Sequence, residues 1–202
     1  MKKIIGFAII ILTGVVSHAQ LKGDALGYFN WNFGPTISNH FVSNFSGEGA
    51  NAGYSYFIMD NLSVGAELGW NNYNEYAPRQ TYTTKNGAVT TDMYKYIYTL
   101  PVTATITKYF KTSSFVYPYT KLGVGALYSQ QNLYYNIFET TDSNWGFAVV
   151  PEIGANIKLN PSNSWAFNVG AQYKVSTNKN SNYNISNLQT YNFNVGITCR
   201  IR

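Results

Sequence analysis

The chain has 202 residues, which suits one domain or one closed sheet of short strands. Charged residues make up 11% and aromatic residues 17%, with 18 tyrosines, whereas an ordinary soluble domain is about 25% charged. The formal net charge of +5 includes no cluster of lysine and arginine, which excludes a nucleic-acid-binding patch, and the mean hydropathy of −0.18 excludes a bundle of transmembrane helices.

The N-terminus has the three parts of a secretory signal peptide. Two lysines precede an apolar run at 4–16, and Ser17-His18-Ala19 supplies the small residues that signal peptidase reads. The apolar run is shorter than the roughly 20 residues that a helix needs to span a bilayer. We therefore predict a cleaved signal peptide at 1–19 and one domain at 20–202.

After this segment, apolar and polar residues alternate with the period of two that is typical of strands. The clearest segment, 62–71, places Leu62, Val64, Ala66, Leu68 and Trp70 on one face and Glu67 among the residues of the other. Eight such segments are found, at 28–33, 51–58, 62–71, 94–107, 119–128, 147–159, 165–174 and 191–201. Pro101 and Pro151 fall inside two of them, so we expect a bulge or a local irregularity at each.

The links between these segments alternate in length. Short links occur at 59–61, about 110–114 and about 160–164, and long polar links at about 34–46, 72–92, 129–144 and 176–188. An up-and-down outer-membrane barrel has short periplasmic turns at one end and long extracellular loops at the other. The alternation of link lengths therefore favours such a barrel.

Charge distinguishes the two faces of the predicted strands. The polar parity carries Glu67, Lys95, Lys121, Glu152, Lys158, Lys174 and Arg200, whereas Lys108, beside a short link, is the one charge found on the apolar parity. A lysine or arginine that faces lipid at mid-membrane costs about 2–4 kcal/mol, and a soluble sandwich would carry charge on its solvent face. The sequence therefore predicts an all-β fold, an eight-stranded antiparallel up-and-down transmembrane β-barrel in the Gram-negative outer membrane. A soluble periplasmic β-sandwich is the alternative.

Four inward charges, Glu67, Lys121, Glu152 and Lys174, lie at similar distances from the short links. Eight strands leave an interior that side chains just fill, and a buried charge needs a partner. We predict that these four residues form an ion-pair network that plugs the lumen. A narrow polar path for small solutes is the alternative.

Aromatic residues gather near the predicted strand ends. Trp31, Trp70, Tyr94, Tyr128, Trp145 and Tyr191 lie toward the long links, and Trp165 lies beside a short link. Girdles at the two membrane interfaces explain this placement better than stacking on sugars or nucleic acid.

Residues for catalysis are scarce. Without the signal peptide His40 is the only histidine, in the first long link near Ser38 and Ser43, and no acid on a strand is placed to orient it. One histidine and the single Cys199 do not make a metal-ligand set. We expect no enzyme activity, no metal and no cofactor.

Several motifs carry a family resemblance: Gly53-Tyr54-Ser55-Tyr56 leading to Asp60-Asn61, Leu100-Pro101-Val102, Tyr117-Pro118-Tyr119 and Pro151-Glu152-Ile153-Gly154. In this order they resemble the porin-like outer-membrane β-barrel family, small barrels of the OmpA/OmpX type that are abundant in Bacteroidetes-like Gram-negative bacteria. The resemblance implies contact with outer-membrane lipid and insertion by the barrel-assembly machinery. Such barrels usually end in an aromatic residue, whereas this chain ends Cys199-Arg200-Ile201-Arg202.

The sequence thus predicts a monomeric, non-enzymatic barrel with a structural or surface-interaction role through four long extracellular loops. The loops name no ligand or surface. A narrow porin-like pore is one alternative, and a lipid-modifying enzyme that uses His40 is another.

Overall fold

The computed structural model describes residues 22–37, 41–84, 87–110, 115–135, 137–160 and 164–201, so the predicted signal peptide and His40 lie outside the described residues. The strands are β1 (Ala25–Pro35), β2 (Phe45–Ser46), β3 (Glu48–Met59), β4 (Leu62–Thr84), β5 (Gly87–Tyr109), β6 (Val116–Tyr135), β7 (Phe138–Ile157), β8 (Trp165–Ser176) and β9 (Leu188–Ile201). Among the described residues, no helix is both long and apolar enough to cross a membrane.

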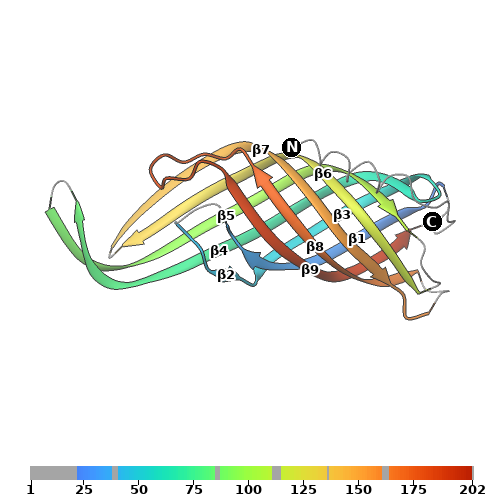
Figure 1. The fold of residues 1–202 in the computed structure, drawn as a ribbon, viewed down its shortest axis with the longest axis horizontal. Helices are drawn as coiled ribbons and strands as arrows, with labels where there is room; N and C mark the ends of the chain where they lie inside the picture. The colour runs from blue at the N-terminus through green and yellow to red at the C-terminus, as the bar shows by residue number, and fades with distance from the viewer. Residues whose placement is uncertain are drawn as a thin grey trace, which may run out of the picture.

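A ring of eight antiparallel strands forms the body of the molecule (Figure 1). Each long strand pairs with the next along the chain, and β1 pairs with β9 from Ala25–Ile201 to Phe33–Phe193, which closes the sheet. The two-residue β2 pairs only with the end of β1. The predicted eight-stranded antiparallel barrel is confirmed, and the two-sheet sandwich is wrong.

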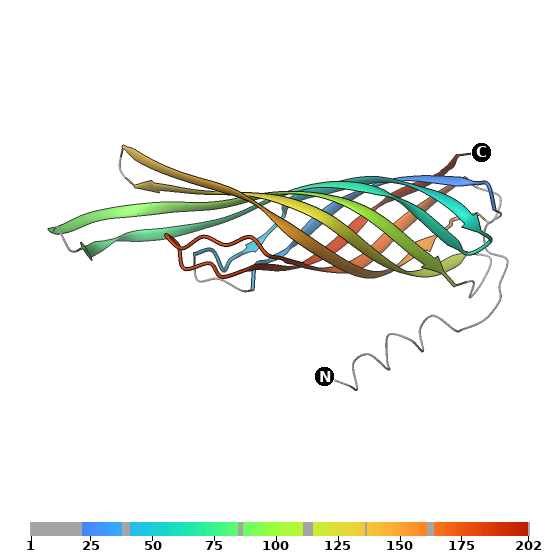
Figure 2. The ribbon, with the colours of Figure 1, turned by 90° about the horizontal axis from the view of Figure 1, so that it is seen from above.

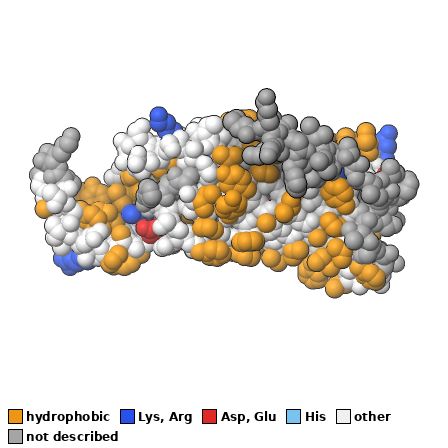
Figure 3. All heavy atoms as spheres, viewed as in Figure 1, with side chains coloured by type: hydrophobic (Ala, Val, Ile, Leu, Met, Phe, Trp, Pro, Cys, Tyr) orange, Lys and Arg blue, Asp and Glu red, His pale blue; other side chains and the backbone are white. Residues whose placement is uncertain are grey.

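The alternating apolar and polar residues of each strand face the outside and the inside of the barrel, respectively. On β3, Tyr54 and Tyr56 are exposed while Asn51 and Ser55 are buried, and the other barrel strands repeat this pattern. Figure 3 shows hydrophobic side chains over the barrel wall, with charged side chains mainly toward the two ends. The buried interior is accordingly rich in Asn, Thr and Ser. This is the inverse of a soluble protein and is typical of a wall that faces lipid.

Two of the predicted long loops are wrong, because these stretches are strands. β4 and β5 stay paired out to Thr84–Gly87, and β6 and β7 stay paired out to Tyr135–Phe138. These strands of 20 to 23 residues project beyond the ring as two joined hairpins (Figures 1 and 2). Away from lipid both faces of a sheet carry polar residues, so no alternation marks it. The tyrosines and threonines there nevertheless have high β-propensity.

The two prolines interrupt hydrogen-bonded ladders without shifting their register. The β4–β5 pairing skips from Leu68–Val102 to Asn71–Thr99 around Pro101, and the β7–β8 pairing skips from Val149–Val175 to Glu152–Gln172 around Pro151. A proline has no N–H to donate, so a short gap forms where it faces the neighbouring strand. The expected irregularity is therefore local and is not a bulge at either proline.

Candidate functional site

The centre of the lumen holds an ion-pair network around Lys121. The Lys121 ammonium lies 2.5 Å from Glu67 Oε2 and 2.9 Å from Glu152 Oε2, and all three side chains are buried. Lys121 and Glu152 face each other across the β6–β7 pair, whereas Glu67 reaches them from β4. The barrel thus brings together three of the four predicted residues.

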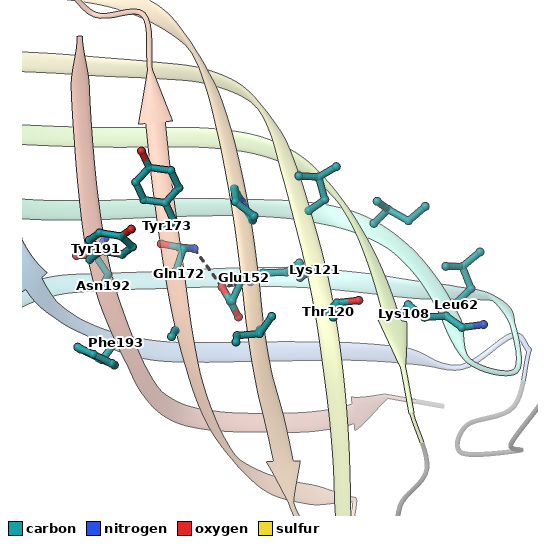
Figure 4. A pocket seen from close by; sticks show the side chains of 15 residues that line it. Leu62, Lys108, Thr120, Lys121, Glu152, Gln172, Tyr173, Tyr191, Asn192 and Phe193 are labelled. Atoms are coloured by element: carbon teal, nitrogen blue, oxygen red, sulfur yellow. Dashed lines mark hydrogen bonds and ion pairs between the residues drawn. The ribbon is translucent and has the colours of Figure 1, made fainter. Parts of the chain in front are cut away.

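The fourth predicted residue, Lys174, is buried nearby with a different partner. Its ammonium donates to Asn71 Oδ1 at 2.8 Å, and no ion pair to a carboxylate is found for it among the described residues. Gln172 instead joins the two glutamates, with its amide 3.1 Å from Glu152 Oε2 and 3.4 Å from Glu67 Oε1. Figure 4 shows Gln172 pointing to Glu152, which in turn lies beside Lys121.

Two tyrosines, Tyr28 and Tyr119, hydrogen-bond to the two glutamates of the network. The Tyr28 hydroxyl donates to Glu67 Oε2 at 2.8 Å, and the Tyr119 hydroxyl donates to Glu152 Oε1 at 2.6 Å. An added Cβ at Gly53 would meet the Tyr28 ring, and one at Gly154 would lie 2.6 Å from the Tyr119 hydroxyl. These glycines therefore make the space that the two rings fill.

The ion-pair network forms a polar layer, and one apolar layer lies on each side of it along the barrel. The layer at the turn end, here called the base cluster, consists of Leu26, Phe57, Tyr109 and Tyr119. The layer at the opposite end, here called the mouth cluster, contains Phe41, Val42, Tyr73, Ile97, Leu127, Ala148, Ile185 and Leu188. Inward-facing strand residues and two chain segments outside the ring both contribute to the mouth cluster.

Hydrogen bonds fix those two segments across the mouth. The buried Asn178 amide donates to the Leu127 and Asn144 carbonyls, each at 3.1 Å, and Asn180 donates to Gln131 Oε1 at 2.9 Å. The Thr36 hydroxyl donates to the Val42 carbonyl. The segment 177–187 is thus attached to β6 and β7, and Val42 is bonded to Thr36 at the end of β1.

A further contact connects the mouth to the projecting hairpin. The backbone N–H and the hydroxyl of Ser43 donate to Glu75 Oε2 at 2.7 and 2.9 Å, and Lys95 lies 3.6 Å from Glu75 Oε1. Burial raises the pKa of Glu75, but the bonds from Ser43 and the charge of Lys95 outweigh burial and lower it overall. Ser43, considered above as part of a catalytic pair, therefore has a structural partner.

The residues predicted to form aromatic girdles lie at different heights along the barrel axis. Pairing places Trp31, Trp70, Tyr128 and Trp145 on one outward row that crosses from β1 to β7. Tyr191 pairs with Tyr173, and Trp165 lies opposite Cys199 toward the turn end. Tyr94 lies six residues beyond Leu100 on β5, paired with Tyr76 and Tyr134, and thus belongs to the projecting sheet.

The mouth cluster and the projecting sheet were not predicted from the sequence. One signal could have indicated the mouth cluster: Tyr73, Ile97 and Leu127 are apolar residues at inward positions, where a polar lumen should have polar residues. Their presence called for an apolar partner inside the barrel, which the loops supply.

A model of the outer membrane protein beta-barrel domain family matches residues 8–200, which is nearly the whole chain. The chain belongs to this family. It is an integral β-barrel protein of the Gram-negative outer membrane, and its wall is surrounded by lipid. Compared with curated protein sequences, the chain shows no significant match.

Solved structures agree with the fold of this outer-membrane barrel. Ail, the attachment invasion locus protein of Yersinia pestis, was solved in complex with the heparin analogue sucrose octasulfate; it is 16% identical, with a TM-score of 0.51 over 90% of this chain and 100% of that chain. Neisserial surface protein A is 14% identical, with a TM-score of 0.52 over 88% of this chain and 99% of that chain. At these identities the likeness shows the fold alone.

Proposed function

We propose that this protein is a sealed, non-enzymatic membrane body that holds a rigid β-sheet outside the cell, where the sheet meets a ligand or another surface. The observation that carries the proposal is the length of β4 to β7. From Trp70, on the outward aromatic row, β4 continues for fourteen residues to Thr84, which is about 45 Å of strand. Spanning the bilayer does not require this length.

The layers of the lumen support a sealed body. A solute crossing the barrel would have to displace the mouth cluster, then the charges of Glu67, Lys121 and Glu152, and then the base cluster. A cavity between Lys121 and Tyr109 measures only about 20 Å³, room for about one water molecule. This packing favours a plug over a narrow pore.

Conductance tests the seal. We expect the refolded protein in a planar bilayer to show no stable conductance steps. Reproducible steps in the wild type that change in Glu67→Ala or Lys121→Ala would mean that the lumen conducts and would refute the seal.

Adhesion tests the projecting sheet. Replacing 72–98 with an Asn-Gly turn would join the paired positions Asn71 and Thr99 and leave the paired strands of the ring in place. Cells that carry the full-length protein should adhere to epithelial monolayers or immobilised matrix proteins, and cells with the shortened hairpin should not. The control is Thr81→Ala, a small change within the hairpin. Equal adhesion of full-length and shortened proteins on every surface would refute the display role.

A further inference from the structure

The outward face of the projecting sheet differs from the lipid-facing wall below it. Its positions lie on β4 to β7 above the aromatic row, and the register places Asn72, Tyr98 and Gln130 side by side on three neighbouring strands. The next row outward places Asn74, Tyr96, Asn132 and Thr141 together. Amides and tyrosines thus replace the aliphatic side chains of the wall.

Hydrogen bonds hold the polar side chains of this face in place. Gln130 donates to Asn132 Oδ1 at 2.9 Å, and Asn132 donates to the Tyr134 hydroxyl at 3.2 Å and to Glu139 Oε1 at 3.1 Å. On the other side of Tyr98, Asn72 donates to Glu48 Oε2 at 2.5 Å. These groups are therefore fixed before any ligand arrives, which lowers the entropic cost of binding.

The tyrosines are also arranged in a fixed way. The rings of Tyr96 and Tyr98 are parallel to within 4°, with centroids 6.0 Å apart, and Tyr134 meets Tyr96 edge-on at 5.7 Å. Tyrosine rings present an apolar face together with a hydroxyl, and they lose little conformational freedom on binding. The same area thus offers apolar ring surface and polar groups within a few ångströms.

Tyr98 lies where these groups converge. Burial raises the pKa of its hydroxyl, and two neighbouring tyrosine hydroxyls and then the carboxylates of Glu48 and Glu139 raise it further. Directly beside it, the Oδ1 atom of the buried Asn72 has no hydrogen-bond partner among the described residues. That oxygen is itself enclosed, so the exposed acceptors beside the ring are the carboxylates of Glu48 and Glu139.

The charge of the face restricts the ligand. It carries Glu48 and Glu139, and the sequence has no lysine or arginine anywhere between Lys121 and Lys158, the stretch that supplies its β6 and β7 positions. On β4 and β5 the outward positions 72–76 and 94–98 add only asparagine and tyrosine. Sulfated or phosphorylated ligands would be repelled, since the described residues of this face include no lysine or arginine to receive them.

We propose that this tyrosine face, centred on Tyr98 and flanked by Glu48 and Glu139, binds a neutral oligosaccharide carried by another surface. Sugar rings have C–H faces that pack on aromatic rings, and their hydroxyls donate to carboxylates and amide oxygens and accept from amide N–H groups. Protein interfaces are also enriched in tyrosine, so a protein partner is the outcome that the experiment below must separate from a saccharide. This inference rests on the proposed display role and names the chemistry that the sheet recognises.

The test uses the full-length protein, folded in detergent micelles, on immobilised neutral hexasaccharides of glucose, galactose, mannose and N-acetylglucosamine, with a heparin hexasaccharide and lipopolysaccharide beside them. We expect at least one neutral hexasaccharide to bind with a Kd below about 1 mM. Tyr98→Phe should weaken binding about tenfold, the effect of losing one hydrogen bond of about 1.4 kcal/mol. Tyr96→Ala should weaken it further, and Thr81→Ala should leave it unchanged.

Three outcomes would overturn the inference: no binding of any neutral hexasaccharide, binding confined to heparin or lipopolysaccharide, or wild-type affinity in both tyrosine variants. Heat-modifiable migration on gels shows that each variant is folded, so lost binding cannot be ascribed to a lost barrel. If cells still adhere through the hairpin to a protein-coated surface while no sugar binds, the display role stands and the saccharide is wrong.

Discussion

Replacing Lys121 with methionine tests whether the centre of the lumen is closed to water. The change removes the one cation that contacts both Glu67 and Glu152, at 2.5 and 2.9 Å. With an effective dielectric constant of about 20, each pair contributes about 6 kcal/mol of Coulomb attraction, much of which is offset by the desolvation of the charges. Leaving buried carboxylates without a partner costs about 3–5 kcal/mol, and we expect Lys121→Met to lose that much stability.

The measurement is the free energy of unfolding in phospholipid vesicles, from urea titrations followed by tryptophan fluorescence. Lys95→Met is the matched control, since this partly exposed lysine lies 3.6 Å from Glu75 and its loss should cost at most about 1 kcal/mol. Adding Glu67→Gln and Glu152→Gln to Lys121→Met should restore part of the lost stability, because the two carboxylates that Lys121 neutralised are then uncharged, while the buried Lys174 keeps its bond to Asn71. If Lys121→Met costs no more than Lys95→Met, water reaches the network and the sealed lumen is wrong.

Three further predictions concern the wall, the packing and the mouth. Leu68→Arg, on the lipid-facing surface, should destabilise the protein in bilayers by about 2–4 kcal/mol, whereas Thr81→Arg in the projecting hairpin should have almost no effect. Equal costs would contradict the placement of Leu68 in the lipid and of Thr81 outside it. Gly53→Ala should displace the Tyr28 ring and cost about 1–3 kcal/mol in the same urea titrations, and an unchanged midpoint would show that the ring is not confined. Because the folded-state pKa of Glu75 is lowered, its bonds to the mouth segment contribute stability above the carboxyl's usual pKa, and this stability is lost as the pH falls through the lowered value. The protection factors of the amides in residues 41–46, which are corrected for the intrinsic pH dependence of exchange, should therefore fall at acidic pH in the wild type, and Glu75→Gln should remove this pH dependence of the protection factors.

The barrel itself could be predicted because lipid imposes a strict contrast on every strand within it. Residues such as Leu68 and Glu67 must face opposite ways, and the pattern repeats through all eight strands of the ring. Outside the membrane this contrast disappears, and the stretches 72–84 and 87–92 have the composition of a loop although they form paired strands. The projecting sheet was missed for that reason.

The candidate site was only partly predictable for a different reason. The alternation of inward and outward positions along each strand shows that four charged residues point inward, Glu67, Lys121, Glu152 and Lys174. It does not show which of them meet across the lumen. The stagger between strands decides this, and it brings Glu67 to Lys121 while leaving Lys174 beside Asn71. The tyrosine face likewise depends on the register of four strands, which places Tyr98 between Asn72 and Gln130.

The sequence by itself determined the fold class, the membrane location and which face of each strand is apolar. These follow from the local alternation of apolar and polar residues and from the cost of placing charge in lipid. Only the tertiary structure decided that two loop segments close the mouth, that four strands extend beyond the ring, and that Tyr98 lies between Asn72 and Gln130. Those features depend on residues far apart in the chain, and their contacts are set by strand register and barrel stagger, which local composition does not encode.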